Sequence, residues 1–135
     1  MPHSPGVGAS FAQKLDYLLS ATGRSAAEVV VAMNEAGYPL SVGHMSDLRR
    51  GTAKNPTLQV INGLAHVFQI RAAYLLDDPE AVDQVEAELE LRAAQRDAEV
   101  VDIALRVAGL DPDKRVALQR EIARIIREHD DAPDA

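Results

Sequence analysis

The sequence predicts an all-α protein with five short helices followed by a two-helix appendage. Aliphatic residues recur at three- and four-residue intervals through most of the chain, which is the spacing of amphipathic helices. Aromatic residues make up only 4% of the 135 residues and Trp is absent, whereas β-sheets favour aromatic and β-branched side chains. Serine, threonine and proline stand where several of these helices would begin.

The first two helices are predicted by their caps. Residues 1–9 are rich in Pro and Gly without periodicity, so we expect a disordered arm. The segment Ser10–Gln13 has the spacing of a capping box and predicts a first helix that Gly23 ends. A second capping box, Ser25–Glu28, predicts a helix that continues to Ala36.

The stretch Ser41–Gly51 predicts a short third helix that leaves most of its surface exposed. It follows the tight connection Gly37–Leu40. Its apolar anchors, Met45 and Leu48, lie on one face when 100° is counted per residue. Because two anchors are few for a core helix, the rest of its surface is expected to face something other than protein.

Two further helices complete the predicted bundle. Pro56-Thr57 has the pattern of a helix start, and residues 58–68 carry an apolar stripe at helical spacing. Residues 70–76 predict a short fifth helix that covers the end of the bundle. Helices joined by connections of a few residues are typical of a compact, locally wired bundle.

The segment Asp77–Pro79 combines turn residues with a shift to acidic composition and predicts a domain boundary. Nothing breaks a helix from Glu80 to Ala108, which would be about 43 Å long. Leu110–Pro112 then begins a last helix. The expected division is a helix-turn-helix domain over residues 10–78, a helical dimerisation domain over 79–129 and a disordered acidic tail over 130–135.

Two helices alone cannot bury the aliphatic stripes of this appendage, so we expect a second copy of the chain to cover them. The predicted partner is a further copy of the chain, in a homodimer or a higher oligomer. The alternative is that the appendage folds back on the first five helices. The residues expected at the dimer interface are Val82, Val85, Leu89, Val100, Ile103, Val107, Ile122 and Ile125.

The net charge of −7 is unevenly distributed. Residues 1–78 hold six basic and six acidic residues, so residues 79–135 carry the whole −7. Within residues 41–76 there are four basic residues and one acidic residue, a net charge of +3. This local balance is compatible with phosphate contact although the total charge is acidic.

The third helix and its surroundings are the candidate interface for double-stranded DNA. Arg50 suits guanine or a phosphate, Asp47 can accept from cytosine N4, and Val42 can touch a thymine methyl group. Helix starts and the basic loop suit backbone phosphates. The candidate set is Arg24, Ser25, Ser41, Val42, Gly43, His44, Ser46, Asp47, Arg50, Lys54, Asn55 and Thr57.

Several of these residues also have structural explanations that do not involve DNA. The third helix could present a solvated polar face on which Arg50 pairs with Asp47. Thr57 could cap its helix or contact a phosphate, and capping is the favoured role. Arg49 falls near the core edge, where it would lie along the apolar surface or pair with Glu35.

Several function classes have little support. Cysteine is absent, so the sequence offers no disulfide or thiolate site. His3, His44, His66 and His129 show no metal-ligand spacing, and no Gly-x-Gly-x-x-Gly or Walker loop occurs. We therefore expect no enzyme, no cofactor, no metal and no small-molecule effector. No membrane span or signal pattern is found, which favours the cytoplasm.

The chain resembles the lambda-repressor-like (XRE-type) helix-turn-helix family. The resemblance is carried by Ser25–Glu28, Met45-x-x-Leu48-x-x-Gly51, Lys54–Thr57, Leu64-Ala65 and Phe68-x-Ile70. It implies sequence-preferring DNA binding and transcription regulation by a five-helix domain. From Ser10 to about His129 the chain is similar to nucleoid-associated regulators with a two-helix appendage, which implies dimerisation and DNA bridging or looping at the nucleoid.

A second hypothesis from another class stays open. The chain could be an all-α protein–protein interaction module, antitoxin-like or adaptor, that works through its C-terminal helices.

Overall fold

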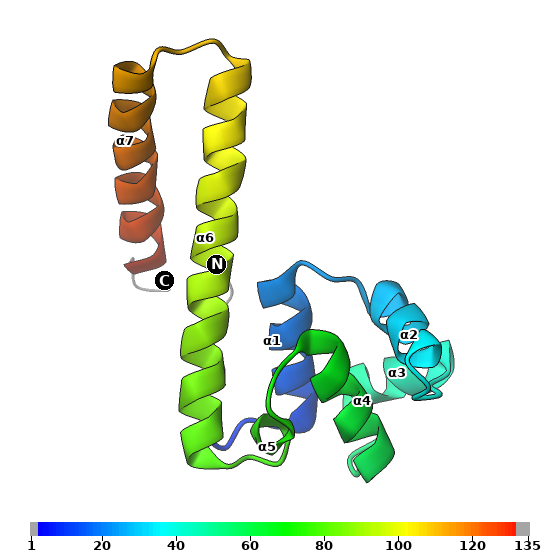
Figure 1. The fold of residues 1–135 in the computed structure, drawn as a ribbon. Helices are drawn as coiled ribbons and strands as arrows, with labels where there is room; N and C mark the ends of the chain where they lie inside the picture. The colour runs from blue at the N-terminus through cyan, green and yellow to red at the C-terminus, as the bar shows by residue number, and fades with distance from the viewer. Residues whose placement is uncertain (1–2, 132–135) are drawn as a thin grey trace. The chain divides into compact units, whose positions relative to one another are not determined.

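The protein is all-α, as predicted. The structure is a computed structural model that describes residues 3–131, with side chains through residue 128, and no strand occurs in this range. The helices are α1 (Phe11–Thr22), α2 (Ala26–Glu35), α3 (Val42–Arg50), α4 (Leu58–Phe68), α5 (Ala72–Leu75), α6 (Pro79–Val107) and α7 (Pro112–Asp131) (Figure 1). In the N-terminal part, α3 packs on α1 and α2, and α4 packs on α2 and α5.

The predicted caps form where the sequence placed them. The Ser10 hydroxyl accepts from the Gln13 N–H at 3.2 Å, and the Ser10 N–H donates to Gln13 Oε1 at 2.9 Å, which completes the capping box. At the start of α2, the Ser25 hydroxyl accepts from the Glu28 N–H at 3.1 Å. Gly23 ends α1 with φ 69°, a left-handed conformation that glycine adopts without a steric penalty.

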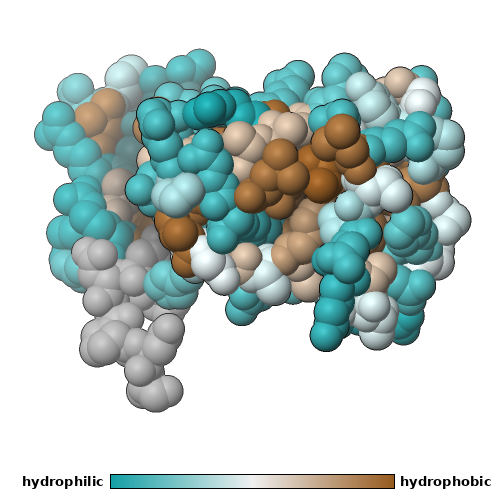
Figure 2. All heavy atoms as spheres, turned by 90° about the horizontal axis from the view of Figure 1, so that it is seen from below, coloured by the Kyte–Doolittle hydropathy of each residue, from teal (hydrophilic) through white to brown (hydrophobic). Residues whose placement is uncertain are grey.

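The chain divides into two compact units, and the division falls inside α6 rather than at Asp77–Pro79. The N-terminal unit ends at Glu90 and the C-terminal unit begins at Leu91. The first turns of α6 belong to the N-terminal unit because their apolar side chains enter its core. Within the described residues, the exposed large hydrophobics of this unit are Val7, Val31, Val42, Leu58 and Leu76. Figure 2 shows apolar patches on the surface of the face that it views.

This packing corrects three of the expected dimer residues. Val82, Val85 and Leu89 are 0%, 3% and 1% exposed and lie in one buried cluster with Leu15 and Tyr74. Side chains this buried within one chain offer no surface to a second copy. The stripe at the start of α6 therefore folds back on the earlier helices, which was the alternative to dimerisation.

The segment expected to be a disordered arm makes defined contacts where the structure describes it, from residue 3. The Gly6 N–H donates to Glu86 Oε1 at 2.9 Å, and the Gly8 N–H donates to Asp77 Oδ1 at 3.2 Å. Asp77 also accepts from the buried ammonium of Lys14 at 2.6 Å. Two carboxylates distant in sequence thus bind the backbone of this segment. Residues 1–2 of the expected arm lie outside the described residues.

Glu86 is the buried carboxylate at the centre of this polar network. It accepts from the Tyr74 hydroxyl at 2.8 Å as well as from the arm, so its oxygens are hydrogen-bonded although its side chain is buried. Burial, followed by the hydrogen bond to Glu86, raises the pKa of Tyr74 well above its usual range. Burial, followed by the charges of Glu90 and Glu86, raises the pKa of Tyr17 to about 12. The Lys14 ammonium holds the pKa of Asp77 below its usual range.

The C-terminal unit contains the rest of α6 and α7. Gly109 turns the chain with φ 78°, and the Asp111 carboxylate caps α7 by accepting from the Lys114 N–H at 2.9 Å. Between the two helices, Asp102 Oδ1 accepts from Gln119 Nε2 at 2.7 Å and lies 3.6 Å from Arg115 Nε. The helix α7 reaches residue 131, into the expected tail, whose residues 132–135 lie outside the described residues.

Gly63 of α4 fixes how closely this helix approaches the connection between α2 and α3. A Cβ atom at this position would lie 2.7 Å from Met33 Cε and 2.7 Å from Tyr38 Cβ. Real Cβ atoms do not approach other atoms so closely, and Tyr38 Cβ is held to the backbone. Only glycine allows α4 to contact this connection.

We predict that Gly63→Ala lowers the free energy of unfolding by about 1–3 kcal/mol, because the new methyl group overpacks a filled site. Gly43→Ala is the matched control. It also places a methyl group on a helical glycine, but no heavy atom lies within 4 Å of that Cβ. It should stabilise by about 0.5–1 kcal/mol through helix propensity. Urea unfolding of both variants checks this, and equal effects of the two would contradict the close approach of α4.

Candidate nucleic-acid interface

Two buried side chains hold α3 against the bundle. Met45 and Leu48 are 2% and 0% exposed, as the sequence predicted. The Ser41 hydroxyl caps the helix by accepting from the His44 N–H at 3.0 Å. Gly51 ends it with φ 77°. The anchors and both caps thus fix a helix whose opposite face is left to the surface.

The connection before α3 is held by a residue that the sequence analysis missed. Asn34 Nδ2 donates to the Val30 carbonyl at 2.8 Å and to the Leu40 carbonyl at 2.9 Å. Gly37 has φ 88°, and Leu40 is buried in the core. A single amide therefore joins the end of α2 to the residue before the α3 cap. An asparagine in the last turn of a helix, three residues before a glycine, is the signal that could have indicated it.

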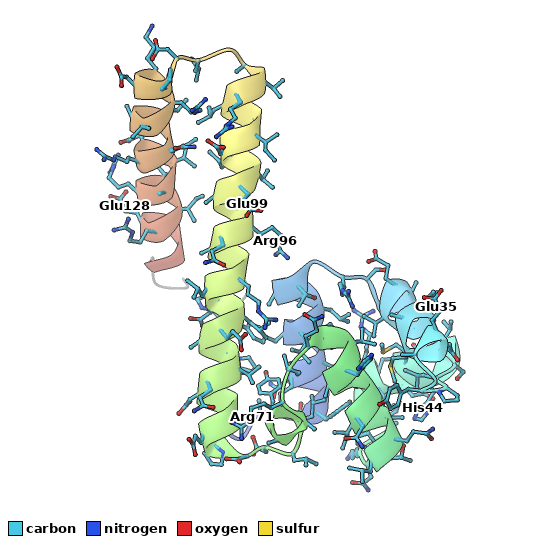
Figure 3. All side chains as sticks on the ribbon, viewed as in Figure 1. Glu35, His44, Arg71, Arg96, Glu99 and Glu128 are labelled. Carbon is cyan, nitrogen blue, oxygen red and sulfur yellow. The ribbon has the colours of Figure 1, made fainter. Side chains whose placement is uncertain are left out.

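The outward residues predicted on α3 share one surface. Val42 is 70% exposed, and the space that a side chain at Gly43 would enter is open. Ser46 and Asp47 are half-buried, and Arg50 is exposed. His44, which is labelled in Figure 3, is half-buried at the side of the helix. The structure thus brings together Val42, Gly43, His44, Ser46, Asp47 and Arg50.

Arg50 and Asp47 form an ion pair along α3. This pair was expected if α3 presents only a solvated polar face. Arg50 Nη2 lies 2.7 Å from Asp47 Oδ1, and the two side chains are 67% and 48% exposed. Exposed pairs of this kind contribute about 0–1 kcal/mol. The guanidinium can therefore exchange this carboxylate for another partner at little cost.

The candidates for phosphate contact are spread over the starts of three helices and one loop. Arg24 Nη1 donates to the Val67 carbonyl in the last turn of α4 at 3.0 Å, so it also joins two elements. Ser25, Ser41 and Thr57 are N-caps; the Thr57 hydroxyl accepts from the Val60 N–H at 3.2 Å, as expected. Lys54 and Asn55 lie in the exposed loop before α4. Their side chains thus share one unit with α3.

Arg49 pairs with Asp16 of α1. A pair with Glu35 was one of the two alternatives that the sequence suggested for it. Arg49 Nη2 lies 3.5 Å from Asp16 Oδ1, and both side chains are substantially exposed. Sequence spacing could not show this pair, because the two residues are 33 positions apart.

An open groove of about 410 Å³ runs between α2 and α3 beside this ion pair. Its floor is apolar and its rim carries the two arginines of α3. The lining residues are Asp16, Ala26, Ala27, Val30, Val42, Met45, Ser46, Arg49 and Arg50.

The remaining expected dimer residues belong to the C-terminal unit and fall on different faces. Val100, Ile103 and Val107 of α6 are 61%, 61% and 83% exposed. At 100° per residue they lie on one face, roughly opposite Val101 and Leu105. Ile125 of α7 is exposed as well. We call Val100, Ile103 and Val107 the α6 stripe.

Ile122 lines a second groove, of about 750 Å³, between α6 and α7. Apolar side chains make much of its wall, and charged residues stand at its edge. Its lining comprises Ala94, Asp97, Ala98, Glu99, Val101, Asp102, Val116, Gln119, Arg120, Ile122, Ala123, Ile126 and Arg127. The α6 stripe and this groove are therefore two separate apolar surfaces of the C-terminal unit.

The helices α2 and α3 follow each other with a short connection, and α3 is a capped helix at the surface. This arrangement resembles the helix-turn-helix motif. The chain is 37% identical over 86 residues to the nucleoid-associated protein EspR of Mycobacterium tuberculosis, in the strains CDC 1551 and H37Rv. These residues are 64% of the chain and 64% of EspR, so the chain matches less than two thirds of its relative. No family model matches the chain. Among the residues described, none of the helices has the length and apolar character that crossing a membrane requires.

We predict that Asn34→Ala lowers the free energy of unfolding by about 1 kcal/mol, because the Leu40 carbonyl loses its side-chain donor. Amide hydrogen exchange of residues 37–41 should accelerate more than exchange in α4. Glu35→Ala, which changes the neighbouring exposed residue, is the control and should leave the connection protected. Unchanged exchange in Asn34→Ala would show that the amide does not hold the connection.

Proposed function

We propose that the protein is a DNA-binding transcriptional regulator associated with the nucleoid, in which α3 is the recognition helix of a helix-turn-helix. The observation that carries this proposal is the division of α3. Met45 and Leu48 are buried, while Arg50 and its polar neighbours stand on an exposed arc. The similarity to a protein named as nucleoid-associated supports the same function.

The proposed contacts follow from the chemistry of each side chain. With α3 in the major groove, Arg50 binds guanine O6 and N7 or a phosphate, and Asp47 accepts from cytosine N4. Val42 meets a thymine methyl group, Gly43 allows close approach, and His44 and Ser46 donate hydrogen bonds. The residues proposed at backbone phosphates are Arg24, Ser25, Ser41, Lys54, Asn55 and Thr57. The contacts with bases, and not those with phosphates, would give the sequence preference.

We further propose that the C-terminal unit joins two copies of the chain through the α6 stripe. Val100, Ile103 and Val107 are the most exposed of the expected dimer residues. A two-fold axis would let each stripe cover its copy. One recognition helix per chain reads few base pairs, so two copies would raise specificity. Where the two helices cannot reach major grooves about 34 Å apart, the dimer would bridge or loop DNA.

The domain division proposed from the structure places the boundary after Glu90. The DNA-binding domain thus keeps the first turns of α6, and the dimerisation domain begins at Leu91. We propose that the protein works in the cytoplasm, at the nucleoid, without a cofactor.

Binding to duplex DNA is predicted to weaken with salt, with log affinity falling linearly against log salt concentration. The double variant Arg50→Ala, Lys54→Ala should weaken binding and make this slope shallower by about 1 to 2. Arg71→Ala is the control, because Arg71 lies at the start of α5, away from His44 and α3 (Figure 3). Fluorescence anisotropy over a range of salt concentrations measures both quantities.

Binding that ignored the double change would remove Arg50 and Lys54 from the interface. Failure of the wild-type protein to bind DNA at low salt would contradict the proposed function. A stable complex with another protein through α6 and α7 would then favour the alternative function, a protein–protein interaction module. The apolar groove between these two helices supports that alternative.

We predict that Ile103→Glu converts a dimer to a monomer without lowering stability, because Ile103 is exposed in one chain. Leu89→Glu should instead unfold the N-terminal unit, since it buries a charge in the core. Sedimentation velocity gives the association state and circular dichroism gives the fold. A monomeric wild-type protein, or a dimeric Ile103→Glu variant, would refute the α6 stripe as the interface.

A further inference from the structure

Arg49 is the one arginine of the α3 end that the candidate set for DNA contact left out. It stands beside Arg50 on the rim of the groove between α2 and α3. The two arginines differ in their partners. Arg50 pairs within α3 at 2.7 Å, whereas Arg49 reaches across to Asp16 of α1 at the longer distance of 3.5 Å.

The helical position of Arg49 decides what it would meet on DNA. At 100° per residue, Arg49 lies about 110° from the outward direction opposite Met45 and Leu48, on the side of the groove and of Asp16. An α-helix with its side chains is about 10–12 Å across and the major groove is about 12 Å wide. The sides of an inserted helix therefore face the phosphate strands, while its outward arc faces the bases.

The groove beside Arg49 leaves room for a strand of DNA backbone. Across from Arg49 and Arg50 it is lined by Ala26 and Ala27, whose side chains are short. Its lining includes the guanidinium groups of Arg49 and Arg50, which pair with the exposed carboxylates of Asp16 and Asp47. A phosphate strand can replace these carboxylates as the partner of the two cations.

The present partner of Arg49 does not prevent this contact. The Arg49 and Asp16 side chains are 46% and 64% exposed, so their pair is screened by water and contributes little. A phosphate offers the guanidinium two oxygens in the geometry that it prefers. On exchange, the Asp16 carboxylate would keep most of its hydration.

We propose that Arg49 is a phosphate-contacting residue that releases Asp16 when the chain binds DNA. This inference rests on the proposed function and extends it. Arg49 positions the N-terminal unit on the sugar–phosphate strand beside α3, and it does not distinguish bases. Asp16 competes with that phosphate for the same guanidinium and weakens binding.

The test compares two duplexes of equal length, one AT-rich and one GC-rich, bound by the full-length chain over a range of salt. Arg49→Ala should lose about eightfold in affinity near 0.1 M salt on both duplexes, with a slope shallower by about 0.9, the effect of one phosphate contact. Asp16→Asn should bind both duplexes more tightly than wild type. Arg71→Ala and Asp83→Asn, charge changes at α5 and α6, are the matched controls.

Thermal unfolding of each variant separates binding from folding, and Asp16→Asn keeps the test valid if Arg49→Ala unfolds, because it leaves Arg49 in place. A slope of Arg49→Ala equal to that of Arg71→Ala would overturn the role of Arg49. A loss confined to one duplex would overturn it too, since that result marks a base contact. Wild-type protein that binds neither duplex would overturn the proposed function together with this inference.

Discussion

The position of α3 is the constraint on which the rest of the structure depends. Met45 and Leu48 anchor this helix against the bundle, and contacts outside this apolar pair help to fix its position. Its place is set by neighbours: the Ser41 cap, the Asn34 bridge to the Leu40 carbonyl, and the close approach at Gly63. Because these contacts lie behind and beside the helix, its outward face keeps side chains that the fold does not use.

Features that depend on near neighbours in the chain were predictable, and those that depend on distant residues were not. The caps at Ser10 and Ser41 follow from a spacing of three residues, which the sequence displays directly. The period of the α6 apolar residues showed that Val82 belongs to a buried face, but not that its own chain buries it. Likewise, the contact of the N-terminal arm with Glu86 spans 80 residues, and no local pattern encodes it.

The candidate interface combines structural and binding groups in the same small region. Arg24 satisfies a carbonyl of α4, and Arg49 and Arg50 pair with carboxylates, yet none of these guanidinium groups is buried. Exposed pairs orient the cations at a small energetic cost, so that a phosphate or a base can replace the carboxylate. The acidic charge of the chain is consistent with this arrangement, because it is concentrated after residue 78.

We propose that the α3 surface, and not the C-terminal unit, meets DNA. The most direct measurement is a titration of the isotopically labelled full-length protein with duplex DNA, followed by amide chemical shifts. We expect the largest shifts at residues 41–51, with smaller ones at residues 24–27 and 54–57, and little change along α7. Shifts concentrated on α6 and α7, with residues 41–51 unchanged, would contradict a recognition role for α3.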